Sequence, residues 1–416
     1  MIIGQPNTKN GKRLQAVLLI ASFVNLFLLS LIGVLMRSFP FFESFPLQYK
    51  NILHGHSHFA FGGWVMPVLF ALTLRYFPEV TDKVKHLHWR NIAALMLFSA
   101  YGMLISFPLQ GYKAVSITFS TLSLISGIYW AVILWRAQRG LIVTVSHQFL
   151  RWGLIYLVLS TVGPFATGPL IVAGKQGTAL YYDAIYFFLH FQYNGFFSFI
   201  VLAIFYKMAE AQKVKGGQAA FLLFNIACIP AYALSVLWHQ PSIWLNIVGG
   251  VAAAIQVVAF VFLLKQIKEM RWSPGLTTRF LIISLLAFTF KLILQLMSAL
   301  PFIASLAYRV RDFVIGYLHL VLLGFISLFV FAVINQQLQS KTFTAAVKLF
   351  LIPFFTTEIL LMITALAAVS RTAIPYASEL LLVFSVLFPL SILIMVVAVR
   401  KSRWIYDEPL NQTERK

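Results

Sequence analysis

The chain has 416 residues, of which 60% are hydrophobic and 11% are charged. A soluble domain cannot bury that much apolar surface, so the composition indicates an integral membrane protein surrounded by membrane lipid. The formal net charge is +20. Lysine and arginine fall mostly in alternate loops, as the positive-inside rule requires, and this distribution excludes nucleic acid as a partner. With Cys228 as its one cysteine, the chain cannot form an internal disulfide, a Cys-ligated iron–sulfur cluster or a C-x-x-C-H haem attachment.

Twelve apolar stretches, each near the roughly 20 residues that a bilayer requires, predict an all-α bundle of about twelve transmembrane helices. Nothing between them is long enough for a soluble domain, so we expect one membrane domain over residues 1–416. The first stretch is too long for a signal-peptide core, which predicts a retained first helix. The predicted spans are 14–37, 50–76, 91–110, 113–137, 148–173, 182–208, 218–239, 242–266, 279–300, 311–335, 346–368 and 376–399.

Loop charges predict the orientation. The basic residues precede span 1 and follow spans 2, 4, 6, 8 and 12, which places both termini, with tails 1–13 and 401–416, on the cytoplasmic side. We therefore expect a multi-pass protein of the inner (cytoplasmic) membrane. His86, His88 and His147 lie on this side and are interpreted as ordinary loop residues.

Span 2 carries three histidines, His54, His56 and His58, at the start of the segment H-G-H-S-H-F-A-F-G-G-W. Ionisable residues in apolar spans are costly and mark functional sites. On a helix His54 and His58 share one face, whereas His56 points nearly opposite, so one metal cannot take all three. The alternative is that they are helix-packing donors to backbone carbonyls.

Spans 6 and 7 add polar groups at similar depth. His190 lies in L-H-F-Q-Y-N-G-F-F, which includes Asn194, and His239 ends span 7 in L-W-H-Q-P. Together with Tyr317 of span 10, these side chains could line a second polar site. Two imidazoles, an amide and a phenol are a weak ligand set for a transition metal.

Spans 9 and 11 each contain a charged residue about ten residues from the predicted outer end. Lys291 is the costliest residue in the chain unless it is paired, and Glu358 is its obvious counter-charge or else a proton-relay carboxylate. Arg309, Arg311 and Arg371 fall in predicted outer loops. They could bind haem propionates through bidentate contacts or be ordinary solvated residues.

Span 10 repeats the pattern of span 2. Residues 55–64 read G-H-S-H-F-A-F-G-G-W and residues 316–325 read G-Y-L-H-L-V-L-L-G-F, so glycine, histidine and glycine recur at equal offsets. His56, His58, His190 and His319 all lie about six to nine residues into their helices, roughly 10–13 Å below the outer surface. Imidazoles from two helices are a common way to hold haem iron. The pattern predicts a haem b between spans 2 and 10, ligated by His319 and by His58 or His56.

Twelve spans, with histidines early in span 2, in span 6, at the end of span 7 and in span 10, resemble subunit I of the haem–copper oxidase superfamily, which includes cytochrome c oxidases and nitric oxide reductases. The resemblance implies that His319 and a span 2 histidine ligate a low-spin haem. Tyr49 and Pro67 flank His56 much as in the oxidases, the internal repeat selects His58, and L-H-G around His54 resembles other branches. The segment from His190 to Gly195 resembles the reductase motif in which the histidine helps to bind a non-haem metal.

Three departures from the family pattern affect the second site. The adjacent histidine pair of span 7 is His239-Gln240, the ligand of the second haem is replaced by Tyr317, and the reductase carboxylate is replaced by Asn194. These changes argue against a second haem and against a non-haem copper or iron centre at His190 and His239. A tyrosinate can ligate haem iron, which keeps Tyr317 open as a ligand.

The sequence therefore predicts a haem protein of respiratory type that transfers electrons or binds or reduces a diatomic gas (O2 or NO) at an altered second site. As an oxidoreductase of the oxidase or reductase type it would use Tyr317 and Asn194 near the gas, with Lys291 and Glu358 managing protons. An electron donor and other respiratory subunits are the expected partners. The alternatives are a haem-based sensor or accessory protein, and a haem-free transporter that uses Lys291 and Glu358.

Overall fold

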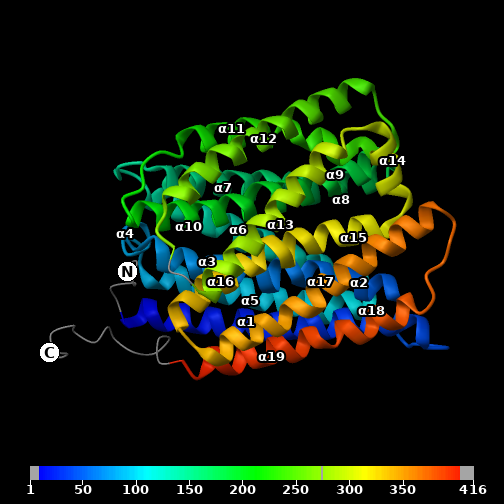
Figure 1. Ribbon diagram of the computed structural model, residues 1–416, viewed down its shortest axis with the longest axis horizontal. Helices are drawn as coiled ribbons and strands as arrows, with labels where there is room; N and C mark the ends of the chain where they lie inside the picture. Colours follow the sequence, from blue (N-terminus) through cyan, green and yellow to red (C-terminus); the bar gives the residue numbers. More distant parts are fainter. Residues whose placement is uncertain (1–8, 273–274, 403–416) are drawn as a thin grey trace. The chain divides into compact units, whose positions relative to one another are not determined.

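The computed structural model describes residues 9–272 and 275–402, so the predicted tails 1–13 and 401–416 lie mostly outside the described residues. Twelve helices in the described part of the chain are long and apolar enough to span a membrane, and this confirms the predicted all-α membrane fold (Figure 1). Their ends lie within about five residues of the predicted ones. They are Gly11–Phe41, Tyr49–Tyr76, His86–Gln110, Ala114–Ala137, Val145–Val172, Ala179–Ala211, Gln218–His239, Ile243–Glu269, Leu276–Met297, Arg311–Leu338, Lys341–Val369 and Ala377–Arg400.

Several spans are built from consecutive helical elements. The single-helix spans are α5 (His86–Gln110), α6 (Ala114–Ala137), α12 (Ile243–Glu269), α13 (Leu276–Met297) and α17 (Lys341–Val369). The composite spans are α1 (Lys9–Ser38) with η1 (Phe39–Phe41); α2 (Tyr49–Phe59), η2 (Ala60–Val65) and α3 (Met66–Tyr76); α7 (Val145–Ser160) and α8 (Val162–Val172); α9 (Ala179–His190), η3 (Phe191–Phe197) and α10 (Ser198–Ala211); α11 (Gln218–Cys228) and η4 (Pro230–His239); α15 (Arg311–His319), η5 (Leu320–Ser327) and α16 (Leu328–Leu338); and α18 (Ala377–Ser385) with α19 (Leu387–Arg400). Two short helices, α4 (Pro78–Thr81) and α14 (Pro301–Arg309), lie between spans.

The three spans that carry the candidate histidines contain π-helical segments. Segment η2 begins two residues after His58, η3 begins directly after His190, and η5 begins directly after His319. π-Helical turns are rare and occur frequently at functional sites. Among the described residues, π-helical geometry is confined to these three places, each next to a histidine predicted as a ligand.

Side chains compensate for the altered backbone bonding in each π-helical segment. Inside a bilayer every backbone polar group needs a partner within the protein. At least one carbonyl in each segment accepts a hydrogen bond from a polar side chain: the Gly63 carbonyl from Asn25 Nδ2 (2.7 Å), the Tyr193 carbonyl from Ser198 Oγ (2.6 Å) and the Phe325 carbonyl from Ser284 Oγ (2.7 Å).

Each π-helical segment also contains a glycine that an aromatic ring covers. A Cβ at Gly63 would lie 2.6 Å from the Phe59 ring, and one at Gly324 would lie 2.7 Å from the Phe354 ring. In η3 a Cβ at Gly195 would lie 2.7 Å from Cβ of Tyr156. The glycines that recur between spans 2 and 10 therefore provide space for close packing.

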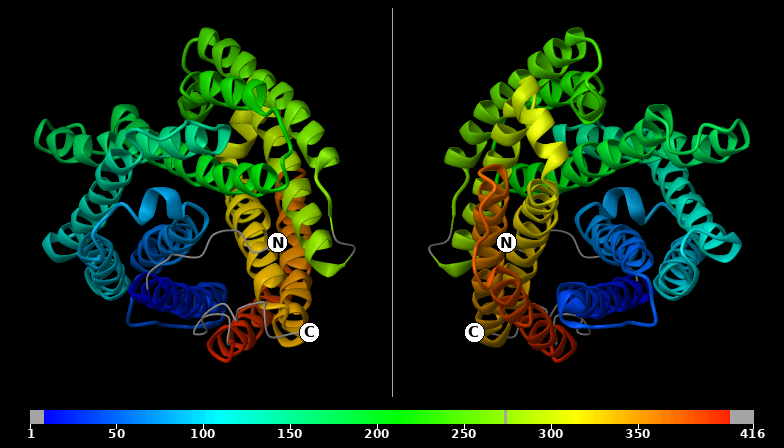
Figure 2. Two further views of the ribbon diagram at one scale, coloured as in Figure 1. Left: turned by 90° about the vertical axis from the view of Figure 1, so that its left-hand side faces the viewer. Right: turned by 90° about the vertical axis from the view of Figure 1, so that its right-hand side faces the viewer.

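By internal contacts the described chain divides into two compact units. The first contains residues up to Ser126, Phe331–Pro353 and the residues from Leu382; the second contains Gly127–Val330 and Phe354–Leu381. In the first unit α1 packs along α3 and α19 (Figure 1). In the second unit α11 lies beside α12, and α8 lies beside α9 (Figure 2).

Candidate functional site

Two of the three histidines in span 2 face α5 and the turn that follows it. The His58 ring stacks on Phe107, with ring centroids 4.3 Å apart and planes inclined by 8°. Its Nε2 lies 2.8 Å from the Tyr112 hydroxyl. His54 packs edge-on against the same tyrosine, with centroids 4.7 Å apart. Both rings are thus engaged by aromatic side chains of the first unit.

His56 points to the opposite side of α2, toward α1. Its ring contacts the backbone of Leu29 and interacts electrostatically with Arg37. A Cβ placed on Gly33 would lie 3.5 Å from His56 Cε1. The ring nitrogen Nδ1 is buried and has no hydrogen-bond partner. Among the span 2 histidines, His56 therefore has a fully buried ring nitrogen without a partner.

Leu29, Gly33 and Arg37 are spaced four residues apart and so share one face of α1. This face combines a small residue, which lets the His56 ring approach, with an arginine that can pair with an anionic group. None of the three was predicted from the sequence. An arginine inside span 1, at helical spacing from a glycine, was the signal that could have identified them.

In span 10, His319 lies beside a carboxylate. Its Nδ1 is 3.7 Å from Glu358 Oε1, and the side chains are 32% and 18% exposed. A Cβ on Gly316, one turn earlier, would lie 3.6 Å from Glu358 Oε2. Lys291 is instead buried, at 2% exposure, with Nζ 5.6 Å from the centroid of Phe288. These contacts of Lys291 and Glu358 thus involve different partners, Phe288 and His319.

His190 is buried, and the protein occupies both of its ring nitrogens. Nε2 lies 2.8 Å from the Cys228 carbonyl oxygen, to which it can only donate, and this leaves Nδ1 as the acceptor of a 3.1 Å bond from Asn194 Nδ2. The remaining amide oxygen of Asn194 is buried and has no hydrogen-bond partner. A metal at His190 would have to displace one of these bonds.

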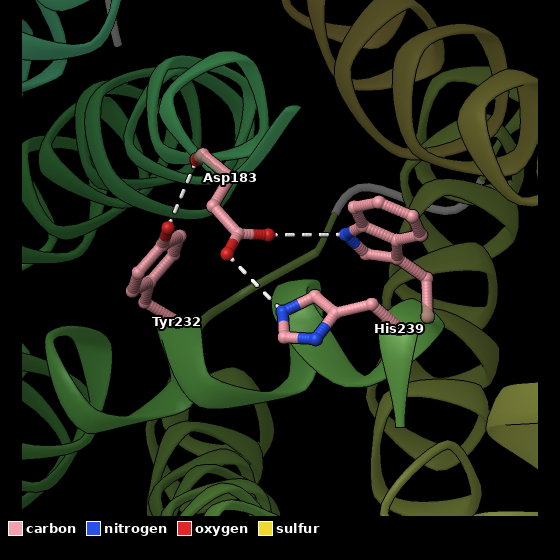
Figure 3. Close-up of polar contacts among 4 residues, drawn as sticks. Asp183, Tyr232 and His239 are labelled. Atoms are coloured by element: carbon pink, nitrogen blue, oxygen red, sulfur yellow. Dashed lines mark hydrogen bonds and ion pairs between the residues drawn. The ribbon is translucent and has the colours of Figure 1, made fainter. Parts of the chain in front are cut away.

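His239 belongs to a separate hydrogen-bonded cluster that is centred on Asp183 of α9 (Figure 3). Its Nε2 is 3.2 Å from Asp183 Oδ2, Trp238 Nε1 donates to Oδ1 (3.1 Å), and the Tyr232 hydroxyl donates to the Asp183 carbonyl (2.9 Å). Asp183 precedes His190 by seven residues, or about 10 Å along a helix. Two predicted partners, His190 and His239, thus bind different groups. Asp183 was not predicted, although a carboxylate inside an apolar span is the same signal that selected Glu358.

Replacing Asp183 by leucine should destabilise the second unit. Trp238 and His239 would lose their acceptor at a partly buried position, at a cost of about 1–3 kcal/mol. Tyr232→Phe is the matched control, because it removes a single neutral hydrogen bond to the Asp183 backbone and should cost about 1 kcal/mol. Thermal unfolding in detergent compares the two variants. Equal melting temperatures for Asp183→Leu and the wild type would contradict a stabilising role for this hydrogen-bonded cluster.

The other predicted residues are placed as follows. The Tyr317 ring lies edge-on to the Tyr193 ring, with centroids 6.2 Å apart. Arg311 begins α15 and Arg371 follows α17, and both are exposed. Within the described residues, no group of three or more His, Cys, Asp or Glu side chains is arranged to hold a metal ion.

No family model matches the sequence, and no curated protein matches it either. The structure is similar to a haem–copper terminal oxidase that was solved by cryo-EM as a dimer. The TM-score is 0.67 with 14% sequence identity, covering 95% of this chain and 85% of that chain. The chain has the fold of a haem–copper terminal oxidase. The fold expected from the sequence resemblance is thereby confirmed.

Proposed function

We propose that this protein is a respiratory-type membrane protein that holds one haem b between imidazoles of spans 2 and 10 and transfers electrons. The observation that carries the proposal is the shared design of the two spans: a π-helical segment with a ring-covered glycine begins two residues after His58 in span 2 and directly after His319 in span 10. The oxidase-like fold supports it. The same proposal places the protein in the inner membrane with both termini cytoplasmic, beside an electron donor and other respiratory subunits.

We assign His56 rather than His58 or His54 as the span 2 ligand. His58 is stacked on Phe107 and bonded to Tyr112, so ligation would break these contacts. His56 has a buried Nδ1 without a partner, and it faces Gly33 of α1. A buried ring nitrogen without a hydrogen bond is costly, and iron ligation would remove that cost.

The other ligand is His319, whose Nδ1 faces a carboxylate and whose Nε2 would bind the iron. When bound, haem supplies a one-electron couple. The residues of the chain hold and orient it and keep water away. Arg311, eight residues before His319 in α15, and Arg371 are proposed to bind its propionates.

Reduction of O2 or NO at a dinuclear centre needs a second metal beside the haem. His190 is bonded to Cys228 and Asn194, and His239 is bonded to Asp183, so these residues do not fit such a metal. We therefore favour electron transfer over gas reduction. Tyr317 and Asn194 then act as packing and hydrogen-bonding groups.

A second candidate function rests on Lys291. A lysine that is 2% exposed inside an apolar span marks a proton or substrate site by default. A haem-free proton-coupled transporter would use this residue. The proposal differs from the first in requiring no bound cofactor.

Spectroscopy and stoichiometry of the purified protein separate these functions. We expect a reduced-minus-oxidised α-band of the b type and one haem per chain. Carbon monoxide should not shift the reduced spectrum, because His56 and His319 would both hold the iron; a shift would instead favour gas sensing through the haem. A colourless protein would overturn the haem proposal and favour the transporter. Two haems, or one haem with a stoichiometric second metal, would instead restore the reductase.

A further inference from the structure

Glu358 and His319 form an acid–imidazole contact in the second unit. Oε1 of Glu358 lies 3.7 Å from Nδ1 of His319. Gly316 of α15 faces the same carboxylate, because a Cβ at this position would lie 3.6 Å from Oε2 of Glu358. The glycine therefore leaves space for Glu358 beside α15. The carboxylate thus lies over the last turn of α15, immediately before η5.

A second contact between the same two helices supports this register. Thr364 Oγ1 donates to Asp312 Oδ2 at 2.8 Å. Asp312 lies seven residues before His319 in α15, and Thr364 lies six residues after Glu358 in α17. The helices are therefore antiparallel here and are joined at two levels about two turns apart. This arrangement limits how far Glu358 can slide away from His319.

Resting on the proposed function, we propose that Glu358 is a positioning residue for His319. In the haem-bound protein its carboxylate would close on His319 and accept the Nδ1 proton, which would select the tautomer with an unprotonated Nε2 and orient that nitrogen toward the iron. Carboxylate partners of metal-bound imidazoles orient the ring and raise its basicity. A more basic imidazole favours ferric over ferrous iron, so Glu358 lowers the midpoint potential of the haem. Lys291, which lies over Phe288, has no part in this pair.

Glu358→Gln and Glu358→Leu test the assignment in the purified full-length protein. Glu358→Gln keeps the shape and a neutral acceptor, so we expect it to retain haem with a raised midpoint potential and a changed EPR spectrum of the ferric state. Glu358→Leu removes the acceptor and should weaken haem retention by about 10–100-fold. Thr364→Val is the matched control. It removes the neighbouring α15–α17 hydrogen bond and should leave the potential and the EPR spectrum unchanged.

The outcomes separate this inference from the function on which it rests. A wild-type protein without haem would overturn the proposed function. A wild-type protein with haem whose Glu358→Gln variant shows the same potential and EPR spectrum would overturn only the role of Glu358. A shift of equal size in Thr364→Val would assign the effect to helix packing and would also overturn that role. If Glu358→Leu fails to fold, Glu358→Gln still decides.

Discussion

Replacing His319 by leucine should abolish the haem absorbance of the purified protein. Without His319 a non-covalently held haem would keep a single imidazole ligand and would otherwise depend on apolar contacts. We expect near-complete loss of haem during purification, measured as the pyridine haemochrome per chain. Leucine also leaves Glu358 without its imidazole partner, so the folded state has to be verified by circular dichroism and gel filtration.

The matched control is His147→Gln. His147, expected in a loop from the sequence, is instead a buried residue of α7 in the same unit, bonded through Nδ1 to Thr144 at 2.8 Å, and it has no place in the proposed site. This variant should keep the full haem content. A His319→Leu protein that is folded and retains the b-type spectrum would show that the ligand of span 10 has been assigned wrongly.

His56→Gln should remove the haem, whereas His58→Gln should keep it. The two substitutions are identical and lie two residues apart, so differences in expression or hydropathy cannot explain opposite results. Loss at His56 follows from removing the proposed ligand that faces Gly33. His58→Gln loses the ring stacked on Phe107 and the bond to Tyr112. It should therefore lower the free energy of unfolding by about 1–2 kcal/mol, seen as a lower melting temperature, without loss of haem.

Haem content and the EPR spectrum of both variants decide between the histidines. The reverse result, with haem lost in His58→Gln and retained in His56→Gln, would select the histidine favoured by the internal repeat. It would also require the His58 ring to leave Phe107 when haem binds. Haem retained in both variants would exclude each of them and leave His54.

The fold could be predicted from the sequence because its causes are local. A span needs about 20 apolar residues, and its backbone N–H and C=O groups form their hydrogen bonds within the same helix. The ends of Tyr49–Tyr76 and Gln218–His239 therefore agree with the predicted limits almost to the residue. Agreement is poorer at Lys341–Val369, because the polar residues Lys341, Thr342 and Thr344 conceal the first turn of the helix.

The site was only partly predictable because helix rotation depends on packing. The repeat identified span 2 and span 10, but three histidines in five residues could not be ordered until α1 and α5 defined the two faces of α2. Asp183 shows the same limit. Its acceptors bind Trp238 and His239, which are more than 50 residues away in sequence and are brought near it by the packing of η4 on α9.

The π-helical segments also affect how this chain can be compared with others. In η2, η3 and η5 the backbone bonds span five residues instead of four, so the halves of a span before and after the segment are out of phase with a regular α-helix. Removing one residue there would restore the regular pitch and rotate one half against the other. The hydropathy and the ability to cross the bilayer would hardly change. Single-residue insertions and deletions at these three points are therefore nearly invisible in a hydropathy profile, yet they decide which side chains face the interior.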